Sequence, residues 1–502
     1  MAHYPFFVYN ALMQLKLIKQ ILKEQPQSQS IEICGWVRTK RDMKGLVFAE
    51  VNDGSCFASI QCTFDRAAGL DSQTEEALQS LTTGASVKIK GRLIPSPASG
   101  QTVEIAADFL KITGTAPAEN TNAQNSEGKV LLTGGSGADG KVLEIPAYPL
   151  QKKRHSMEFL REIAHLRPRT NTFGAIARLR SRLAFAIHRY FAERDFCYLH
   201  TPVITAGDCE GAGAMFQVTM LDPCAEPDFA NDFFGKKTYL TVSGQLEAET
   251  YASALSRVYT FGPAFRAENS NTARHLAEFW MVEPEIAFAE LEDDMALAED
   301  FLKYIFNCAL QECADELKFF DAHIEKGIIE NLQKIANAAF THITYTDAIK
   351  ELEKAAAANN ELFTFQPRWG CDLQSEHEKY LTEKIADGPV IITDYPKEIK
   401  AFYMKMNNDG KTVRAMDVLV PRLGEIIGGS QREDNLEKLI LRMNEMNMKT
   451  QDYWWYLDLR RYGSVPHAGF GLGFERLIQY VSGMANIRDV IPFPRAAGQL
   501  VI

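Results

Sequence analysis

Charged and aromatic side chains crowd the stretch from Phe265 to Trp280, which reads FRAENSNTARHLAEFW. Arg266 offers a planar fork that matches phosphate oxygens, and Arg274 and His275 add cations across a polar turn. Phe279 supplies a ring on which a base can stack. These residue types favour a nucleotide site, although a solvated hairpin with internal ion pairs stays open as an alternative for this stretch alone.

Two further stretches carry charges of the same kinds. A glycine-rich strand is predicted directly before a helix that opens with Glu475 and Arg476, so a ligand can approach the backbone and the arginine can reach its phosphate. Asp417 and Glu425 lie on strand-like runs that bracket a turn, and Arg432 follows a glycine pair. Two carboxylates near a phosphate-rich ligand favour a Mg²⁺ site, whereas each alone is more often a salt-bridged strand residue.

The composition limits what these residues can bind. The 502 residues carry 54 Lys and Arg against 65 Asp and Glu, a formal net charge of -11, which excludes a uniformly basic nucleic-acid surface but not a local one. No GxxxxGK[ST] loop and no GxGxxG motif between a strand and a helix are present, so side chains must supply the positive charge for a bound nucleotide. The nine scattered cysteines predict free thiols in a reducing cytosol. Lysines interrupt the apolar N-terminal stretch and no apolar run is long enough to span a membrane, so we expect a cytoplasmic protein.

The predicted elements divide the chain into a small barrel and a larger mixed domain. An amphipathic N-terminal helix is followed by five strand-like segments between residues 31 and 112, which predict the barrel. The segment 113–141 is rich in Gly, Ser, Thr, Asn and Ala and predicts a linker or flexible insertion. A long helix over about 171–193 and a strand then precede an irregular alternation of strands and helices, with a helical block over about 291–360. This order favours an α+β domain built on an antiparallel sheet.

The long helix with its strand, the stretch FRAENSNTARHLAEFW and the stretch GFGLGFERLI resemble signature motifs 1, 2 and 3 of class II aminoacyl-tRNA synthetases. The resemblance narrows to the aspartate, asparagine and lysine subgroup, and within it to the asparagine enzymes. Motif 1 then covers about 171–205, motif 2 about 261–285 and motif 3 about 468–495. Further similar stretches are FLREIAHLRPRTNT, EGAGAMF, WGCDLQSEHEKYL and TDYPKEIKAFYM, so the resemblance covers nearly the whole chain apart from the insertion.

The resemblance implies a domain division, a fold and a set of site residues. Residues 1–112 form a helix and a five-stranded anticodon-binding barrel, 113–150 a linker, and 151–502 a catalytic domain with a six- or seven-stranded antiparallel sheet flanked by helices. Motif 1 is expected to form a homodimer interface. The implied catalytic residues are Arg266, Glu268 and Arg476; the ATP-binding residues are Arg266, Arg274, His275, Phe279, Glu425 and Arg476; the Mg²⁺ ligands are Asp417 and Glu425; the amino-acid-binding residues are Glu210, Gln245, Glu249 and Arg432; and the anticodon-binding residues are Phe48 and Gln61.

The reaction implied by the resemblance joins L-asparagine to tRNA(Asn) at the expense of ATP. The α-carboxylate of the amino acid attacks the α-phosphate of ATP, which gives an aminoacyl-adenylate and pyrophosphate, and a ribose hydroxyl of the terminal adenosine then takes the acyl group. Such a site needs Mg²⁺, cations and alignment rather than a protein nucleophile, so no Ser–His or Cys–His pairing has to be found.

The choice between asparagine and aspartate depends on the charge opposite the substrate's side chain. Similar aspartate enzymes carry a QLxK stretch whose lysine faces the substrate carboxylate, whereas this chain reads GQLEAE, with Ala248 in place of the lysine. A carboxylate buried without a cation is strongly disfavoured, while an amide NH₂ can donate to a glutamate. We therefore predict that Glu249 contacts the side-chain amide and Arg432 its oxygen. Glu247 lies either beside the substrate or on a solvated helix face.

Three other interpretations stay open. The first is an aspartate-accepting enzyme, strict or relaxed, against whose strict form Ala248 argues. The second is a catalytically silent relative that binds tRNA, against which the full set of charged site residues argues. The third is an amide-forming ligase that does not use tRNA and would have no need of the N-terminal barrel.

Overall fold

The structure is a computed structural model of the chain, which divides into two compact units, Met1–Gly174 and Ala175–Ile502. The residues that the structure describes are 15–97, 100–117, 130–131, 144–145, 147–150, 153–209, 214–222, 224, 226–270 and 272–500. Much of the predicted linker lies outside these residues. Within it, the short strands β6 (Val130–Leu131) and β7 (Glu144–Ile145) pair with each other.

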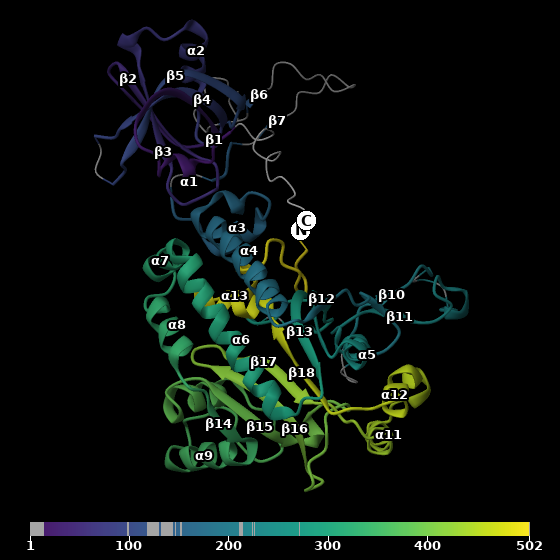
Figure 1. Ribbon diagram of the computed structural model, residues 1–502. Helices are drawn as coiled ribbons and strands as arrows, with labels where there is room; N and C mark the ends of the chain where they lie inside the picture. Colours follow the sequence, from purple (N-terminus) through teal and green to yellow (C-terminus); the bar gives the residue numbers. More distant parts are fainter. Residues whose placement is uncertain are drawn as a thin grey trace, which may run out of the picture. The chain divides into compact units, whose positions relative to one another are not determined.

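Five strands of the first unit close into a barrel in the order β1-β2-β3-β5-β4, which confirms the predicted five-stranded barrel (Figure 1). They are β1 (Gln27–Met43), β2 (Leu46–Asn52), β3 (Ile60–Asp65), β4 (Ser86–Pro95) and β5 (Val103–Gly114), with helix α2 (Ser72–Ser80) between β3 and β4. Of the described residues before β1, only Ile18–Ile21 (α1) are helical. The predicted N-terminal helix is therefore much shorter in the part of the chain that the structure describes.

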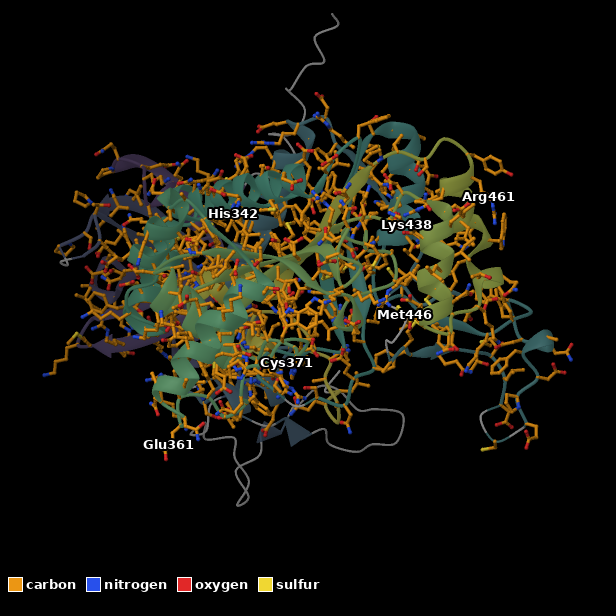
Figure 2. All side chains as sticks on the ribbon, turned by 90° about the horizontal axis from the view of Figure 1, so that it is seen from below. His342, Glu361, Cys371, Lys438, Met446 and Arg461 are labelled. Carbon is orange, nitrogen blue, oxygen red and sulfur yellow. The ribbon has the colours of Figure 1, made fainter. Side chains whose placement is uncertain are left out.

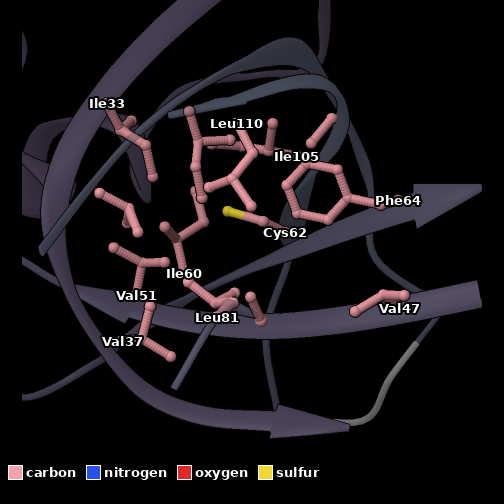
Figure 3. Close-up of a cluster of buried hydrophobic side chains, with 14 of the residues drawn as sticks. Ile33, Val37, Val47, Val51, Ile60, Cys62, Phe64, Leu81, Ile105 and Leu110 are labelled. Carbon is pink, nitrogen blue, oxygen red and sulfur yellow. The ribbon is translucent and has the colours of Figure 1, made fainter. Parts of the chain in front are cut away.

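Alternation of apolar and polar residues sends one face of each barrel strand into the core. In β3, Ile60, Cys62 and Phe64 are fully buried, while Gln61 and Thr63 point to the outside. Figure 3 shows Cys62 and Phe64 among the apolar side chains of the neighbouring strands. The same alternation places Phe48 of β2 on the outer face, where it is paired with Thr63.

The second unit contains an eight-stranded sheet in the order β14-β15-β16-β17-β18-β13-β12-β8. Its strands are β8 (Cys197–Leu199), β12 (Arg257–Phe265), β13 (Glu278–Ala287), β14 (Thr341–Thr344), β15 (Val390–Pro396), β16 (Thr412–Val420), β17 (Gly424–Gln431) and β18 (His467–Gly473). The resemblance predicted six or seven antiparallel strands. The pairs β12/β8 and β14/β15 at the two edges are parallel, because α5 (Gln245–Leu255) and α9 (Tyr345–Ala358) connect them as crossovers.

Helices cover this sheet. α6 (Leu291–Glu312) contacts β16, β17 and β18 on one face (Figure 1), and its acidic first turn suits the positive end of the helix dipole. The other helices of this unit are α7 (Ala314–His323), α8 (Ile328–Asn337), α10 (Ser375–Tyr380), α11 (Leu436–Glu445), α12 (Trp454–Arg461) and α13 (Phe474–Ser482), and α4 (Asn171–Ala192) leads into it. The predicted helical block over 291–360 is interrupted by β14. Among the described residues, no helix is both long and apolar enough to cross a membrane.

A small three-stranded sheet completes the second unit. It consists of β9 (Ile204–Thr205), β10 (Gln217–Val218) and β11 (Thr238–Leu240), in the order β10-β11-β9. The strand predicted after the long helix is thus split into β8 and β9, with Pro202 between them, since proline has no N–H to donate to a strand ladder.

We expect Phe64→Ala to lower the free energy of unfolding of the barrel by about 3–5 kcal/mol, because removal of a fully buried ring leaves a cavity in the core. Met43, which is 63% exposed on β1, provides the control, and Met43→Ala should change this free energy by less than about 0.5 kcal/mol. Denaturant titration measures both. A loss below about 1 kcal/mol for Phe64→Ala would contradict the closed core.

Candidate active site

Two adjoining cavities lie on one face of the eight-stranded sheet. The larger has a volume of about 650 Å³ and the smaller about 150 Å³. Both are lined by Arg266, Glu268, Met281, Glu425 and Gly471. A ligand in the smaller cavity can therefore place a group beside Arg266, where this group can react with a second ligand in the larger cavity.

The smaller cavity gathers the residues predicted to bind ATP. Its lining includes Arg266, Glu268, Arg274, His275, Phe279, Glu425 and Arg476. The hairpin of β12 and β13 supplies the first five of these, because Arg266 directly follows β12 and Phe279 is the second residue of β13. The guanidinium of Arg266 lies 5.5 Å from the centre of the Phe279 ring. A phosphate held by Arg266 would thus lie near a flat apolar surface for a base.

Polar contacts fix the loop between β12 and β13. His275 Nδ1 lies 2.5 Å from Thr272 Oγ1, and its Nε2 lies 3.9 Å from the carboxylate of Glu268. Arg274 Nη1 donates to Ser375 Oγ on α10 at 2.6 Å. Arg274 and His275 are therefore each held at the cavity by a polar contact.

One buried carboxylate joins the three segments that resemble the signature motifs. Glu475, in the first turn of α13, is 1% exposed. It accepts hydrogen bonds from Arg180 of α4, at 2.5 Å, and from the backbone N–H of Trp280 in β13, at 2.8 Å. The next residue, Arg476, donates from Nη1 to the carbonyl of Glu425 at 3.1 Å. Glu475 thereby fixes the helix turn from which Arg476 enters the smaller cavity.

The two residues predicted to hold Mg²⁺ both line the larger cavity. A Cβ atom placed on Gly428 would lie 3.3 Å from Glu425 Oε1 and 3.5 Å from Asp417 Oδ1, so these carboxylates converge over a glycine. Lys400 Nζ donates to both oxygens of Asp417, at 2.9 and 2.8 Å. Oxygen ligands of this kind fit Mg²⁺ bound mainly through phosphates. Among the described residues, no group of three or more His, Cys, Asp or Glu side chains is arranged to hold a metal ion without other ligands.

A third carboxylate, Glu378 of α10, lies beside this pair and was not predicted. Its Oε2 accepts from the backbone N–H of Glu425 at 3.4 Å. Burial, followed by repulsion from Glu425, raises the pKa of Glu378 to about 7. Burial also raises the pKa of Asp417. Carboxyl groups that are driven together in this way favour the binding of a cation.

The larger cavity contains a buried arginine held by a carboxylate. Arg432 Nη2 donates to Glu285 Oε1 at 2.5 Å, and its Nη1 donates to Ser430 Oγ at 2.7 Å. The side chains of Arg432 and Glu285 are 2% and 0% exposed. Gln245, which was also predicted to bind the amino acid, lines the same cavity at the start of α5.

Sequence reasoning missed Glu283 and Glu285, which both line the larger cavity. Glu283 accepts from the backbone N–H of Gly244 at 3.1 Å and from Thr260 Oγ1 at 3.0 Å, so it caps the start of α5. The signal was present in the strand pattern. Met281, Glu283 and Glu285 alternate along β13 and share one face, and two carboxylates on a central strand are rarely buried without a purpose.

Glu249 does not lie where the sequence analysis placed it. The side chain is fully buried and lines neither cavity, because its carboxylate is surrounded by donors from α12 and β18. Its predicted contact with a substrate amide is thus replaced by contacts within the protein. Ala248 packs in an apolar cluster with Ala252 and Val258 and does not line the cavity either. Glu247 is half-buried outside both cavities, and burial raises the pKa of its carboxyl.

Three predicted residues remain, namely Glu210, Phe48 and Gln61. Glu210 lies outside the described residues. Phe48 and Gln61 lie on the outer face of the barrel, where Gln61 Nε2 donates to Glu104 Oε2 at 2.9 Å and Thr63 Oγ1 donates to Glu104 Oε1 at 3.1 Å. Glu104, which was not predicted, is 4% exposed and fixes the orientation of the Gln61 amide.

Comparison with known proteins adds independent findings. Residues 156–497 match the family model of tRNA synthetases class II (D, K and N), and residues 31–113 match that of an OB-fold nucleic acid binding domain. The asparagine–tRNA ligase of Treponema denticola is 59% identical over 96% of this chain and 98% of its own length, and that of Microcystis aeruginosa is 54% identical over 95% and 98%. The crystal structure of asparaginyl-tRNA synthetase from Pyrococcus horikoshii complexed with asparaginyl-adenylate has a TM-score of 0.81 at 30% identity, over 97% of this chain and all of that chain.

The buried pair of Arg432 and Glu285 gives a test of the larger cavity. Glu285→Ala is expected to lower the free energy of unfolding by about 3–5 kcal/mol, because it leaves a buried guanidinium without its counter-charge. The control is Glu292→Ala, which removes the partner of Arg414 in an exposed pair and should cost less than about 1 kcal/mol. Denaturant titration measures both variants. Equal losses would contradict the burial of the Arg432 pair.

Proposed function

The chain belongs to the class II tRNA synthetases of the aspartate, lysine and asparagine group, and from this membership we propose that it attaches L-asparagine to tRNA(Asn). The reaction consumes ATP, passes through asparaginyl-adenylate and releases pyrophosphate and AMP. The observation that carries this function is the near full-length identity with asparagine–tRNA ligases. The aspartate alternative is not favoured by these relatives.

The two adjoining cavities suit the first step of this reaction. The residues that line the smaller cavity contact ATP, with its base on Phe279, its α-phosphate at Arg266 and its outer phosphates near His275 and Arg476. Asparagine lies in the larger cavity. One oxygen of its α-carboxylate attacks the α-phosphorus, a new P–O bond forms, and the bond to the β-phosphate oxygen breaks to release pyrophosphate. Arg266 lines both cavities and stabilises the charge on the transferred phosphate.

The second step transfers the asparaginyl group to tRNA. A ribose hydroxyl of the terminal adenosine attacks the acyl carbon of the adenylate, and AMP leaves with the electrons of the broken C–O bond. Glu268 lines both cavities and contacts the adenine or this tRNA end. No protein group forms a covalent intermediate, so alignment of the two reactants supplies the catalysis.

ATP requires Mg²⁺ in this reaction, and the residues present fit the ion. Asp417 and Glu425 would hold it at the meeting point of the cavities. When bound, the ion neutralises phosphate charge. The chain's own cations, Arg266 and Arg476, orient the triphosphate so that the α-phosphate faces the amino acid.

Charge explains why an amide suits the larger cavity better than a carboxylate. Its lining carries the carboxylates of Glu268, Glu283, Glu285, Glu398, Asp417 and Glu425 against the cations Arg266, Lys400 and Arg432. Arg432, which addresses the amide oxygen, is already neutralised by Glu285. A substrate carboxylate would therefore lose its hydration without gaining an unopposed cation, whereas a neutral amide can both donate and accept.

We assign roles in the same reaction to the other parts of the chain. The barrel of residues 1–112 reads the anticodon, with Phe48 stacking on a base and Gln61 contacting a base edge while Glu104 fixes its amide. Residues 113–150 link it to the catalytic domain of 151–502, and Glu210 takes part in binding the amino acid. The motif 1 region over 171–205 forms a homodimer interface, and the protein acts in the cytoplasm.

ATP–pyrophosphate exchange with the purified chain tests this function. Asparagine with Mg²⁺ should support exchange, while aspartate should support it about 100-fold less well, because the cavity pairs its cations with its own carboxylates. Faster exchange with aspartate would establish the aspartate alternative. Exchange with neither amino acid, while the chain still binds tRNA, would identify a catalytically silent relative.

Arg266 offers a sharper test of the assigned chemistry. Arg266→Lys keeps the positive charge but loses the planar fork, and it should lower kcat/KM for exchange about 10²–10³-fold. Arg257→Lys, at an exposed position on β12, the strand that ends just before Arg266, is the matched control and should leave exchange unchanged. Equal exchange activity of the two variants would show that Arg266 does not act on the reacting phosphate.

A further inference from the structure

The ammonium group of Lys400 engages both oxygens of Asp417, one of the two carboxylates assigned to Mg²⁺. Its Nζ donates to Oδ1 at 2.9 Å and to Oδ2 at 2.8 Å, and it lies 3.9 Å from the centre of the Tyr395 ring. The side chains of Lys400 and Asp417 are 17% and 16% exposed, so water solvates neither charge fully. This shielding strengthens the ion pair in the lining of the larger cavity.

A divalent cation and this ammonium group need the same oxygens. Mg²⁺ binds oxygen ligands at about 2.0–2.1 Å in near-octahedral geometry, so it takes a lone pair that Lys400 otherwise uses. Two cations on one carboxylate also repel each other. Glu425 offers the second carboxylate, and its Oε1 converges with Asp417 Oδ1 over Gly428. An ion held by both carboxylates must therefore displace Lys400 from Asp417.

The backbone that carries Lys400 is anchored, whereas its side chain can change conformation. Lys400 directly follows the 3₁₀ turn Lys397–Ile399, and its backbone N–H donates to the Lys397 carbonyl at 3.3 Å. Arg442 of α11 donates to the same carbonyl from Nη2 at 2.5 Å. Met446, labelled in Figure 2, directly follows α11 and lines the same cavity as Lys400. Release of the ion pair thus requires only rotation about the bonds of the flexible lysine stem.

We propose that Lys400 is a built-in competitor of Mg²⁺ for Asp417, which keeps the affinity of the site for a divalent cation low until ATP is bound. This inference rests on the proposed function, in which Asp417 and Glu425 hold the ion that accompanies ATP. Without nucleotide, binding of the ion breaks the ion pair of Lys400 and leaves its ammonium group without a counter-charge. With nucleotide, the phosphates supply negative charge for both cations, so ATP and the ion bind cooperatively.

Binding of Mn²⁺ to the nucleotide-free chain tests this competition. Mn²⁺ prefers the same oxygen ligands as Mg²⁺, and its electron paramagnetic resonance signal measures the free ion. Lys400→Met removes the ammonium group but keeps an unbranched side chain, so Mn²⁺ should bind about 10-fold more tightly than to wild type. Lys400→Gln, whose amide can donate to one oxygen of Asp417, should show a smaller gain, and it serves if Lys400→Met does not fold.

Lys405 provides a matched control on the same connection between β15 and β16. Its Nζ donates to both oxygens of Asp434, at 3.0 and 3.1 Å, in a pair that is also partly buried. Neither residue lines either cavity. Lys405→Met therefore removes the same kind of ion pair at another place, and it should change the dissociation constant of Mn²⁺ by less than about twofold.

The reactivity of the Lys400 amine separates competition from a general repulsion between cations. If the ion displaces Lys400, saturating Mn²⁺ without nucleotide should raise the rate at which acetic anhydride acetylates Lys400 in the wild-type chain severalfold. Mass spectrometry of the digested protein measures this rate, and Lys405 in the same digest is the internal standard. If positive charge only repels the ion, Lys400 stays on Asp417 and its rate does not change.

The outcomes are distinct. Tighter Mn²⁺ binding by Lys400→Met, unchanged binding by Lys405→Met and faster acetylation of Lys400 support the inference. Equal Mn²⁺ affinity of wild type and Lys400→Met overturns it, and so does a gain in affinity without release of Lys400. ATP–pyrophosphate exchange by wild type with asparagine and Mg²⁺ decides the proposed function separately. If exchange occurs, failure of the competition leaves that function standing, whereas absence of exchange contradicts the function whatever the Mn²⁺ constants are.

Discussion

A charge removed from water must be paired, and two such pairs hold the walls of the larger cavity. Glu249 with Arg460 and Glu285 with Arg432 are almost completely buried, so loss of any one partner would leave an isolated charge in the protein interior. In a surface ion pair, by contrast, the loss of one partner costs little free energy, because water solvates the charge that remains. It fixes α5 against α12, and β13 against the segment that follows β17, to within the tolerance of a hydrogen bond.

The charged residues that line the two cavities differ in the partners that they contact. In the larger one, the positive charges of Arg432 and Lys400 are each opposed by a carboxylate in direct contact. In the smaller one, Arg266, Arg274 and Arg476 lie beside the carboxylates of Glu268 and Glu425, and their planar guanidinium groups match the oxygens of a triphosphate. Guanidinium groups thereby do what the backbone N–H groups of a glycine-rich loop do in other nucleotide sites.

Local sequence patterns predicted the strands, the barrel core and the residues that lie together on one hairpin. Alternation along the strands gave the barrel and its core, because side chains two residues apart share a face. The residues of the smaller cavity were found together because most of them lie on one hairpin, with Arg266 and Phe279 on its facing ends. The same rule could have identified Glu283 and Glu285 on β13. The parallel pairing of the edge strands was not predicted, because the pairing of two distant segments cannot be inferred from either segment alone.

The surroundings of Glu249 could be predicted from the sequence only in part. Helix periodicity placed it on the same face as Gln245, so its neighbourhood could be predicted. Whether its carboxylate faces a ligand or the protein depends on donors that lie more than 200 positions along the chain, at Tyr456, Arg460 and His467. A residue type that suits a substrate amide suits an arginine equally well, and the arginine is present before any substrate binds. The carboxylate is therefore held within the protein, by Gln245 of its own helix as well as by these distant donors.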